Sequence, residues 1–544
     1  MPSMIVRKIR ELLTEYLPEG VSFQVEPPPR EEMGDLATNA ALVAASRLGR
    51  KPRDLAEELA QRLAERKELF RRVEVAGPGF LNFFVAPAYW QAVVERVLTA
   101  GPDYGRSALG AGRKVQVEFV SANPTGPLHI GHGRGAAVGD SLARLLDFAG
   151  YRVVREYYIN DRGRQMEVLG RSVWLRAREL SGEEITFPED HYRGEYIIEI
   201  ARKLLAQRPD LLQLPEKEAV SVAREFALSE ILAEIRKDLE DFGVHYDVWY
   251  SERELYERGE VEEALSALRE AGYLYEKDGA LWFRATAFGD EKDRVVFRAN
   301  GEPTYFASDI AYHREKFLKR GFDLVVDVWG ADHHGYVPRL KAALAALKIE
   351  PERLRVLLIQ MVNLIEGGRL KSMSTRAGEF VPLRELMEEV GRDAVRFTFL
   401  TRKCDAPLDF DVELVKSQKS ENPVYYVQYA HARLASVFRK AEEEGLSPEG
   451  YEPSLLETPE DLRVLKLLDF FPQVVEEAAE ALEPHRLTYY LLDLAEALHD
   501  YYTKHRFLSE DRALSRARLA LARAVKQVLA NGLNLLGVSA PERM

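Results

Sequence analysis

Two histidines, His129 and His132, stand in a glycine-rich turn that has the composition of a site for a nucleotide. The surrounding residues 117–135 read VEFVSANPTGPLHIGHGRG. They predict a strand that ends near residue 120, a turn, and a helix that begins near residue 131 or 132. Backbone N–H groups and the dipole at a helix N-terminus favour an anion, and Gly131 and Gly133 let a nucleotide approach the backbone closely. Two imidazoles at this position can hydrogen-bond a triphosphate as negative charge moves towards the leaving group.

The spacing of these histidines alone leaves two other interpretations open. An H-x-x-H pattern is often a pair of local polar side chains, and it is also a metal-binding pattern, although no third and fourth ligand stand nearby. Asp332, His333 and His334 raise the same metal alternative. They follow LVVDVW, a predicted parallel strand, and therefore fall at the carboxyl edge of an α/β sheet, where contacts to a nucleotide or substrate are more usual. The sequence therefore predicts no metal site.

Several further segments identify the family that the sequence resembles. The segment LHIGH (128–132), which follows a predicted strand and the turn PTGP, resembles the HIGH signature of class I aminoacyl-tRNA synthetases. The segment LKSMSTRAGEFVPLREL (370–386) resembles a form of their KMSKS loop. Together with YYINDRGRQ (157–165), GADHHGY (330–336) and ENPVYYVQYAHAR (421–433), these segments resemble arginyl-tRNA synthetases from GDLATNAAL (34–42) to Met544. The resemblance implies two steps: the arginine carboxylate attacks the α-phosphate of ATP, and the 2′-hydroxyl of the terminal tRNA adenosine then takes the aminoacyl group.

The resemblance also implies which residues bind the small substrates. His129 and His132 are expected to contact the phosphates in the transition state. The residues expected to bind ATP are Gly131, Gly133, Asp332, Met361, Val362, Met373 and Ser374. Those expected to bind arginine are Glu118, Ser121, Asn123, Tyr305, Asp309 and His333.

Arginine recognition requires carboxylates that face a planar guanidinium, because paired N–H···O bonds supply both energy and geometry. Glu118 and Asp309 are expected at the guanidinium, and Asn123 at the α-amino or carboxylate end. Tyr305 and Asp309 are four residues apart, so a helix would place ring and carboxylate on one face. His333 stands where the family often has Gln.

The KMSKS-like loop departs from the family pattern, because its pentapeptide is Ser-Met-Ser-Thr-Arg and both customary lysines are replaced. A cation is still needed near the pyrophosphate. Lys371 and Arg376 are the catalytic candidates, with Arg369 behind them, and Arg376 is slightly favoured.

Two regions resemble the tRNA-binding parts of the family. Phe80 and Asn82 in GFLNFFV match positions where a ring and an amide read an unpaired base, although Phe80 is equally compatible with a strand core. A helix near 512–526 carries Arg512, Arg516, Arg518, Arg523 and Lys526, which is either a phosphate-tracking stripe or a solvated face. The residues expected to pack against anticodon bases are Tyr425, Tyr426, Tyr501, Tyr502 and Met544.

The elements that must position these residues form three predicted parts. Residues 1–105 read as an α+β domain that contacts tRNA. Residues 106–410 read as a Rossmann-type α/β catalytic domain, with a helical insertion at about 165–280 and the KMSKS-like loop at 370–380. The strands of this domain are expected at VQVEFV (115–120), residues 153–159, RVVF (294–297), LVVDVW (324–329) and LLIQMV (357–362). Residues 411–544 read as an all-α anticodon-binding bundle.

Composition excludes several other classes of protein. Hydrophobic residues make up 46% and charged residues 30% of the 544 residues, which excludes a disordered or collagen-like chain. The net charge of −13 excludes a protein that coats nucleic acid non-specifically, although a local basic face is compatible with it. With one cysteine, Cys404, the chain forms neither an internal disulfide nor a cysteine zinc cluster. Without a signal peptide or a run of ~20 apolar residues, a cytoplasmic protein is expected.

The resemblance implies ATP with Mg²⁺ as cofactors and L-arginine and tRNA as partners, in a monomer that forms adenylate only after tRNA binds. The nearest alternative is another class I synthetase of the same subgroup. A cysteine-specific enzyme lacks its zinc cysteines here, whereas a lysine-specific one is harder to exclude. A small-molecule nucleotidyltransferase would not need the helical C-terminal part. A non-catalytic tRNA-binding paralogue is supported only by the replaced KMSKS lysines.

Overall fold

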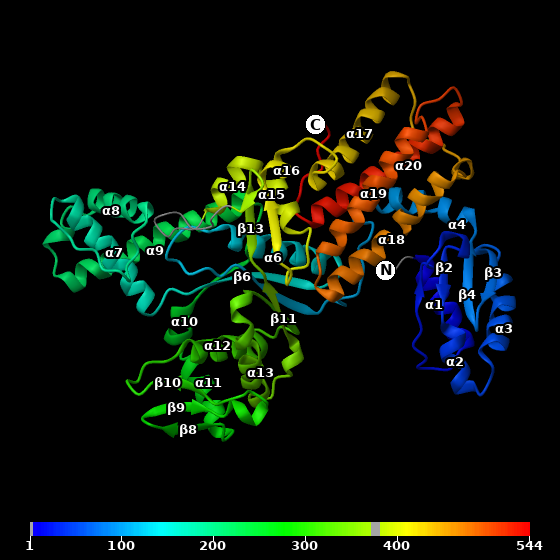
Figure 1. Ribbon diagram of the computed structural model, residues 1–544. Coiled ribbons are helices and arrows are strands. Elements are labelled where there is room, and N and C mark those ends of the chain that lie inside the picture. Colours follow the sequence, from blue (N-terminus) through cyan, green and yellow to red (C-terminus); the bar gives the residue numbers. More distant parts are fainter. Residues whose placement is uncertain (1–3, 371–380) are drawn as a thin grey trace. The chain divides into compact units, whose positions relative to one another are not determined.

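The computed structural model describes residues 4–370 and 381–544, which form two compact units (Figure 1). The larger unit consists of Gly110–Asp147 and Tyr151–Ser417. The smaller unit combines Met1–Leu109 and Phe148–Gly150 with Gln418–Met544. Each unit has its own secondary-structure layers.

The larger unit is built on a five-stranded sheet in which every strand pair is parallel. In spatial order the strands are β12 (Leu354–Ile359), β11 (Leu324–Gly330), β5 (Lys114–Glu118), β6 (Arg152–Ile159) and β7 (Val248–Ser251). The chain order reverses between β5 and β11. In an open α/β sheet, ligands bind at this reversal, outside the carboxyl ends of the strands. The predicted Rossmann-type architecture is confirmed.

The helix that follows β5 packs closely on this sheet. α6 (Ile130–Phe148) lies in the sequence between β5 and β6, as the strand–helix–strand pattern predicted. Val115 and Val117 of β5 are fully buried, as expected for a parallel strand covered on both faces. A Cβ at Gly139 of α6 would lie 2.2 Å from Cγ of Phe119, so no larger residue fits there.

Two predicted strands join other sheets. RVVF forms β10, in an antiparallel sheet made of β8 (Leu274–Lys277), β9 (Ala280–Phe283) and β10 (Arg294–Phe297). LLIQMV is divided, because β12 ends at Ile359 and Val362 begins a strand of a third sheet, made of β13 (Val362–Glu366), β14 (Arg369–Leu370) and β15 (Leu408–Asp411). An apolar run predicts a strand but does not encode which sheet it joins.

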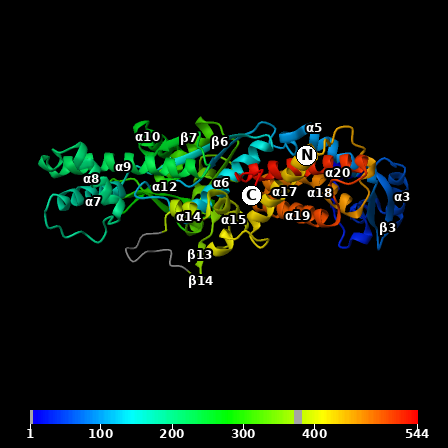
Figure 2. The ribbon, with the colours of Figure 1, turned by 90° about the horizontal axis from the view of Figure 1, so that it is seen from above.

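The predicted insertion contains three long helices and one strand of the main sheet. Figures 1 and 2 show α7 (Arg164–Leu180), α8 (Glu195–Gln207) and α9 (Glu216–Asp241) packed side by side. After α9 the chain forms β7, where only helix was expected. The sequence signal for β7 is weak because this strand has four residues and follows a long charged helix.

The remaining helices of the larger unit are short. α10 (Glu252–Glu257), α11 (Glu260–Glu270), α12 (Tyr305–Arg314) and α13 (Val337–Ala346) share an apolar core with the β8–β10 sheet. A π-helical turn, Glu315–Lys319, continues α12. α14 (Leu383–Val390), α15 (Arg392–Phe399) and α16 (Val412–Lys416) complete the unit.

The N-terminal part of the smaller unit has the predicted α+β character. Its antiparallel sheet contains, in spatial order, β1 (Val25–Glu26), β2 (Leu36–Thr38), β4 (Phe80–Val85) and β3 (Phe70–Ala76). Its helices are α1 (Met4–Tyr16), α2 (Ala40–Leu48), α3 (Pro52–Ala64), α4 (Pro87–Gln91) and α5 (Val93–Ala100). The hairpin predicted around VAGPGFLNFFV is the β3–β4 pair.

The C-terminal part of the smaller unit is the predicted helical bundle. Figures 1 and 2 show α17 (Pro423–Glu443), α18 (Pro459–Ala481), α19 (His485–Lys504) and α20 (Arg512–Leu535) in contact with one another. A capping box formed by Thr458 and Asp461 begins α18. No helix in the described ranges combines the length and apolar character needed to cross a membrane.

Candidate active site at the carboxyl edge of the parallel sheet

The chain leaves β5 through two residues with left-handed backbone conformations. Val120 has φ 68° and Ser121 has φ 40°. Such values are uncommon outside glycine and are particularly unfavourable for β-branched valine, at a cost of about 1–3 kcal/mol each. The turn places the Ser121 hydroxyl 3.0 Å from Oε1 of Glu118, and the same hydroxyl accepts the backbone N–H of Tyr158 at 3.1 Å. The strained turn therefore positions Ser121, which is expected to bind arginine, against Glu118, which is also expected to bind it.

A buried lysine joins the two strands at the point where the sheet order reverses. Nζ of Lys316, in the π-helical turn, lies 2.6 Å from Oε2 of Glu118 on β5 and 3.0 Å from Oδ1 of Asp327 on β11. Nε2 of His313 lies 2.7 Å from the other oxygen of Asp327. Burial opposes the charge of Lys316, but Asp327 and Glu118 raise its pKa, whereas burial raises the pKa of Glu118 even beside this lysine. The single ammonium group of Lys316 therefore forms ion pairs with two buried carboxyl groups.

Two further carboxyl groups lie beside this cluster. Asp309 is on α12, one turn after Tyr305, so the two residues share a helix, as the spacing predicted. The Tyr336 hydroxyl donates to Oδ2 of Asp309 at 2.5 Å. Glu252 begins α10 directly after β7, and its Oε1 accepts from the Ser308 hydroxyl at 2.9 Å. Oε2 of Glu252 is buried and has no hydrogen-bond partner among the residues that the structure describes.

The electrostatics of this pair favour an incoming cation. Burial raises the pKa of Asp309. Burial, followed by the charges of Asp309 and Asp161, raises the pKa of Glu252 to about 7, although the hydrogen bond from Ser308 opposes the shift. A buried carboxylate without a partner is costly, and a cation that pairs with it removes that cost. The ring of Tyr305 is 53% exposed at the start of α12, so it is accessible to a ligand.

The remaining residues expected at the arginine site lie at the same edge of the sheet. Asn123 is exposed, and its Oδ1 accepts from Nδ2 of Asn160 at 3.4 Å. His333 is exposed in the turn after β11, and its Nε2 lies 3.5 Å from Oδ2 of Asp332. Both side chains are therefore accessible from solvent.

The two signature histidines form a compact stacked pair. Their ring centroids are 3.6 Å apart. Nδ1 of His129 accepts the backbone N–H of Gly131 at 3.1 Å, and Nδ1 of His132 accepts the backbone N–H of His129 at 3.2 Å. Because each Nδ1 is an acceptor, each neutral ring carries its proton on Nε2 and is a hydrogen-bond donor there.

Both imidazoles are neutral at physiological pH. Burial lowers the pKa of His129. Burial, together with the charge of His129, lowers the pKa of His132 to about 3. The pair can therefore donate two hydrogen bonds without the desolvation cost of two buried cations.

The glycines of this turn differ in what they contact. A Cβ at Gly131 would lie 3.0 Å from Cε1 of His129, so glycine lets the imidazole fold over the helix N-terminus. A Cβ at Gly133 would lie 2.5 Å from Cδ1 of Leu383. The small size of Gly133 therefore serves packing between α6 and α14. Its expected contact with ATP stays a prediction.

The histidine turn also pairs with the chain that follows the second signature. His129 forms an isolated β-bridge with Pro382, and the backbone N–H of Ile130 donates to the carbonyl of Val381 at 3.3 Å. The expected residues Lys371, Met373, Ser374 and Arg376 lie outside the described residues. The described residue that follows this segment, Val381, therefore lies beside the histidines.

Two further residues expected to bind ATP, Met361 and Val362, follow the carboxyl end of β12. Met361 is 71% exposed, whereas Val362 is buried in β13. In the described part of the chain, no group of three or more His, Cys, Asp or Glu side chains is placed to hold a metal ion.

A separate cleft of about 560 Å³ lies between α8, α9 and α14. The Tyr196 hydroxyl at this cleft donates to the carbonyl of Thr125 at 2.6 Å. Lys203 is paired with Glu230, and Arg384 is paired with Asp238. Because these cations already have partners, we assign no ligand to the cleft.

The residues expected to bind tRNA differ in exposure. In the N-terminal part, Phe80 is 41% exposed, whereas Asn82, two residues further along the same face of β4, is buried. In the C-terminal bundle, Tyr425, Tyr426 and Tyr502 are half-buried. Met544 is exposed at the end of the chain.

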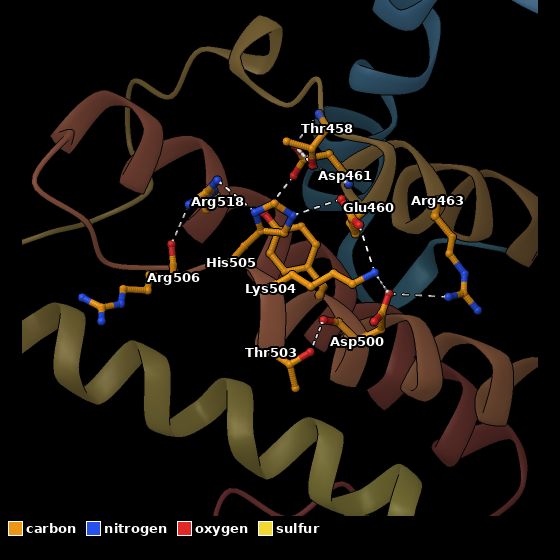
Figure 3. Close-up of polar contacts among 11 residues, drawn as sticks. Thr458, Glu460, Asp461, Arg463, Asp500, Thr503, Lys504, His505, Arg506 and Arg518 are labelled. Atoms are coloured by element: carbon orange, nitrogen blue, oxygen red, sulfur yellow. Dashed lines mark hydrogen bonds and ion pairs between the residues drawn. The ribbon is translucent and has the colours of Figure 1, made fainter.

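A polar network joins the start of α18 to the end of α19 (Figure 3). It includes Tyr501, one of the residues expected to pack against anticodon bases. Tyr501 is buried, and its hydroxyl donates to Oδ1 of Asp461 at 2.8 Å. His505 and Lys504 both contact Glu460. Arg518 donates to the carbonyl of Arg506 at 2.8 Å. Tyr501 and Arg518 therefore stabilise the bundle itself.

An aromatic surface that the sequence did not single out lies next to Tyr425 and Tyr502. The rings of Tyr425 and Tyr429 stack at 5.5 Å, and Tyr429 also stacks on His499. The guanidinium of Arg433 lies over both Tyr429 and Tyr502. Rings and a guanidinium plane on one surface are the chemistry that stacks unpaired bases.

Beside the residues expected to bind arginine lie two that the sequence analysis missed, Glu252 and Lys316. Glu252 follows a strand that was not recognised, so its position at the sheet edge could not be inferred. Lys316 had a detectable signal, because Asp327 interrupts the apolar run LVVDVW and a buried acid needs a cationic partner.

Comparison with known proteins identifies the family. Residues 93–403 match the family described as tRNA synthetases class I (R), catalytic domain. Residues 3–85 match the arginyl tRNA synthetase N terminal domain, and residues 427–544 match the DALR anticodon binding domain.

Relatives match over nearly the whole chain. The arginine–tRNA ligase of Syntrophotalea carbinolica is 54% identical over 539 residues, which cover 98% of this chain and 97% of that protein. The arginine–tRNA ligase of Nitratidesulfovibrio vulgaris is 55% identical over 525 residues, which cover 96% and 95%. The solved structure of Thermus thermophilus arginyl-tRNA synthetase has a TM-score of 0.78 and 26% identity, and the match covers 99% of this chain and 100% of that chain. With its catalytic, N-terminal and anticodon-binding parts all matched, this chain belongs to the arginyl-tRNA synthetase family.

Proposed function

We propose that this enzyme joins L-arginine to its tRNA through arginyl-adenylate, with the residues at the carboxyl edge of the parallel sheet in the roles given below. The observation that carries the assignment of the site is a pair of carboxyl groups, the half-buried Asp309 and the buried Glu252, at the same edge of the sheet as a stacked pair of neutral histidines. The acids suit a cationic amino acid, and the histidines suit a triphosphate.

At the amino-acid end, Asp309 and Glu252 bind the guanidinium. Asp309 is oriented by the Tyr336 hydroxyl, and Oε2 of Glu252 has no other partner among the described residues. Tyr305 covers the aliphatic stem of arginine. Glu118 was expected at the guanidinium, but its two oxygens are already paired with Lys316 and Ser121, so we place it on the β5 side of the substrate instead. Asn123 and His333 reach the α-amino and carboxylate end.

At the nucleotide end, Nε2–H of His129 and His132 donate to the phosphates as the pyrophosphate leaves. Met361 and Val362 bind adenine, and Gly131, Gly133, Asp332, Met373 and Ser374 complete the ATP site. Arg376 or Lys371 supplies the cation that the KMSKS lysines supply elsewhere. Mg²⁺ enters with ATP and is held by phosphates and water, as this hard cation prefers oxygen ligands.

The other parts bind tRNA. Residues 1–105 contact it through Phe80, with Asn82 as its neighbour, and residues 411–544 stack anticodon bases on Tyr425, Tyr426, Tyr502 and Met544. Tyr501 supports this surface from the core. The enzyme acts as a cytoplasmic monomer, with the boundaries of its catalytic domain near residues 106 and 410.

The first test is ATP–pyrophosphate exchange with each of the twenty amino acids, with and without total tRNA. We expect exchange with arginine only, and only when tRNA is present. Exchange with lysine would overturn the assignment of the carboxylate pair. No exchange from folded protein that still binds tRNA would show that the altered KMSKS-like loop is disabling and that the chain is a binding module.

Arginine binding should depend on pH near neutrality because of Glu252. Its pKa of about 7 means that the carboxyl group is mainly protonated at pH 6 and mainly ionised at pH 8. The guanidinium prefers the ionised form, so the Kd for arginine should fall about 10-fold between pH 6 and pH 8. Calorimetry at each pH measures this, and Glu252→Gln should flatten the profile and weaken binding at pH 8. An unchanged profile in that variant would assign the titration to another group.

A further inference from the structure

Arg134 is a fully buried guanidinium whose hydrogen-bond partners are backbone carbonyls. It lies on α6, two residues after His132. Its Nη1 donates to the carbonyl of Gln360 at 2.8 Å, and its Nη2 donates to the carbonyl of Lys403 at 3.0 Å. Burial lowers the pKa of Arg134, although the charges of Cys404 and Asp405 oppose the shift, and no carboxylate accepts a hydrogen bond from it among the described residues. A buried cation with only neutral acceptors is an expensive element in a protein interior.

The carbonyl that Arg134 binds belongs to a very short connection between two sheets. β12 ends at Ile359 and β13 begins at Val362, so only Gln360 and Met361 lie between them. The ladders of the two sheets do not pair these two residues, and their backbone groups need other partners. The N–H of Gln360 donates to the carbonyl of Cys404 at 2.9 Å, its carbonyl accepts from Arg134, and the carbonyl of Met361 accepts from the N–H of Leu408 at 3.1 Å.

This connection ends on an exposed apolar side chain. Met361 is 71% exposed, in contrast to Val362, which is buried. The connection lies at the carboxyl edge of the sheet, where the open α/β fold binds nucleotides. Arg134 thus ties the start of α6, which carries His132 and directly follows His129, to the segment that presents Met361.

We propose that Arg134 is a positioning residue for ATP, which fixes the spacing between the phosphate-binding histidine turn and the adenine-binding segment Gln360–Val362. This inference rests on the proposed function, in which those two elements bind opposite ends of the nucleotide. A guanidinium suits the task because its planar fork reaches two carbonyls at once, whereas an ammonium is a single flexible point charge.

The test is Arg134→Lys, measured by arginine-dependent ATP–pyrophosphate exchange in the presence of tRNA. We expect the KM for ATP to rise about 10- to 100-fold, because a small misplacement of binding groups is costly in a preorganised site. The inhibition constants of AMP and pyrophosphate, which each occupy one end, should change less than threefold. The Kd for arginine should not change. Arg134→Gln, which keeps an N–H₂ donor and removes the charge, is the second variant if the lysine protein does not fold.

Arg396 provides a matched control. It is also fully buried in the same unit, and it donates to the carbonyl of Phe242 at 3.1 Å and to Asp140 at 2.6 Å. Arg396→Lys should lower the Tm and leave the KM for ATP unchanged. An unchanged KM for ATP in both folded Arg134 variants would overturn the proposal, as would an equal weakening of ATP, AMP and pyrophosphate. Failure of the proposed function is a separate result, because the unsubstituted enzyme would then show no arginine-dependent exchange.

Discussion

The Asp309→Ala variant will not use arginine at ordinary concentrations. Removing one partner of a buried charge pair costs about 3–5 kcal/mol, which corresponds to a KM for arginine raised about 100-fold or more. Asp309→Asn should lose nearly as much, because an amide keeps the shape and the contact with Tyr336 but not the charge. Steady-state charging of tRNA at increasing arginine concentration measures the effect. A variant that charges tRNA at near-normal arginine concentration would remove Asp309 from the site.

Asp323 is the matched control for this substitution. It directly precedes β11, and its Oδ2 accepts the backbone N–H of Lys114, at the start of β5, at 2.7 Å. It therefore joins the same two strands at their amino ends, away from the candidate site. Asp323→Asn should lower stability and leave the KM for arginine unchanged. Equal effects of the two substitutions on KM would mean that Asp309 acts only through the stability of the sheet.

The His132→Ala variant should form adenylate about 100- to 1,000-fold more slowly, with tRNA binding nearly unchanged. The expected size is that of removing one preorganised hydrogen-bond donor to developing negative charge. Pyrophosphate exchange measures the chemical step, and a tRNA-binding titration measures the rest of the molecule. Unchanged exchange would show that the phosphates are held elsewhere.

The position of the donor on the ring gives a sharper version of this test. Because Nδ1 of His132 accepts a backbone N–H, only Nε2 can donate to a phosphate. A glutamine amide nitrogen reaches the position of Nε2, whereas an asparagine amide nitrogen reaches that of Nδ1. His132→Gln should therefore retain more exchange activity than His132→Asn. The exposed residue His245 is the control, since His245→Ala should not affect exchange.

Local sequence patterns predicted the secondary structure around the two signature histidines well. Strand, glycine-rich turn and helix followed one another within 117–148, and the spacing of Tyr305 and Asp309 correctly implied a shared helix. These features depend on neighbours within a few residues, which the sequence displays directly.

Residues that act through distant partners could not be inferred in this way. Lys316 and Glu118 are 198 positions apart, and only the fold brings them together. The position of Glu252 at the sheet edge could be inferred only after β7 was known. The sequence did not indicate β7, because a four-residue strand after a long helix gives little periodicity. The sequence also did not predict which tyrosines are exposed. Tyr501 and Tyr502 are adjacent, yet Tyr501 is in the core and Tyr502 is half-buried at the surface of the bundle.

The left-handed turn at Val120 and Ser121 has a consequence for how this enzyme can change. A glycine at residue 120 would adopt the same backbone at little cost, so the valine keeps the folded state less stable than it need be. Glycine would also leave other backbone conformations open to this turn, so the geometry that holds Ser121 against Glu118 would be less firmly fixed. Selection for heat resistance alone would favour such a replacement, and selection for arginine use would oppose it. The most heat-resistant descendant of this chain and the most active one would therefore differ at this turn.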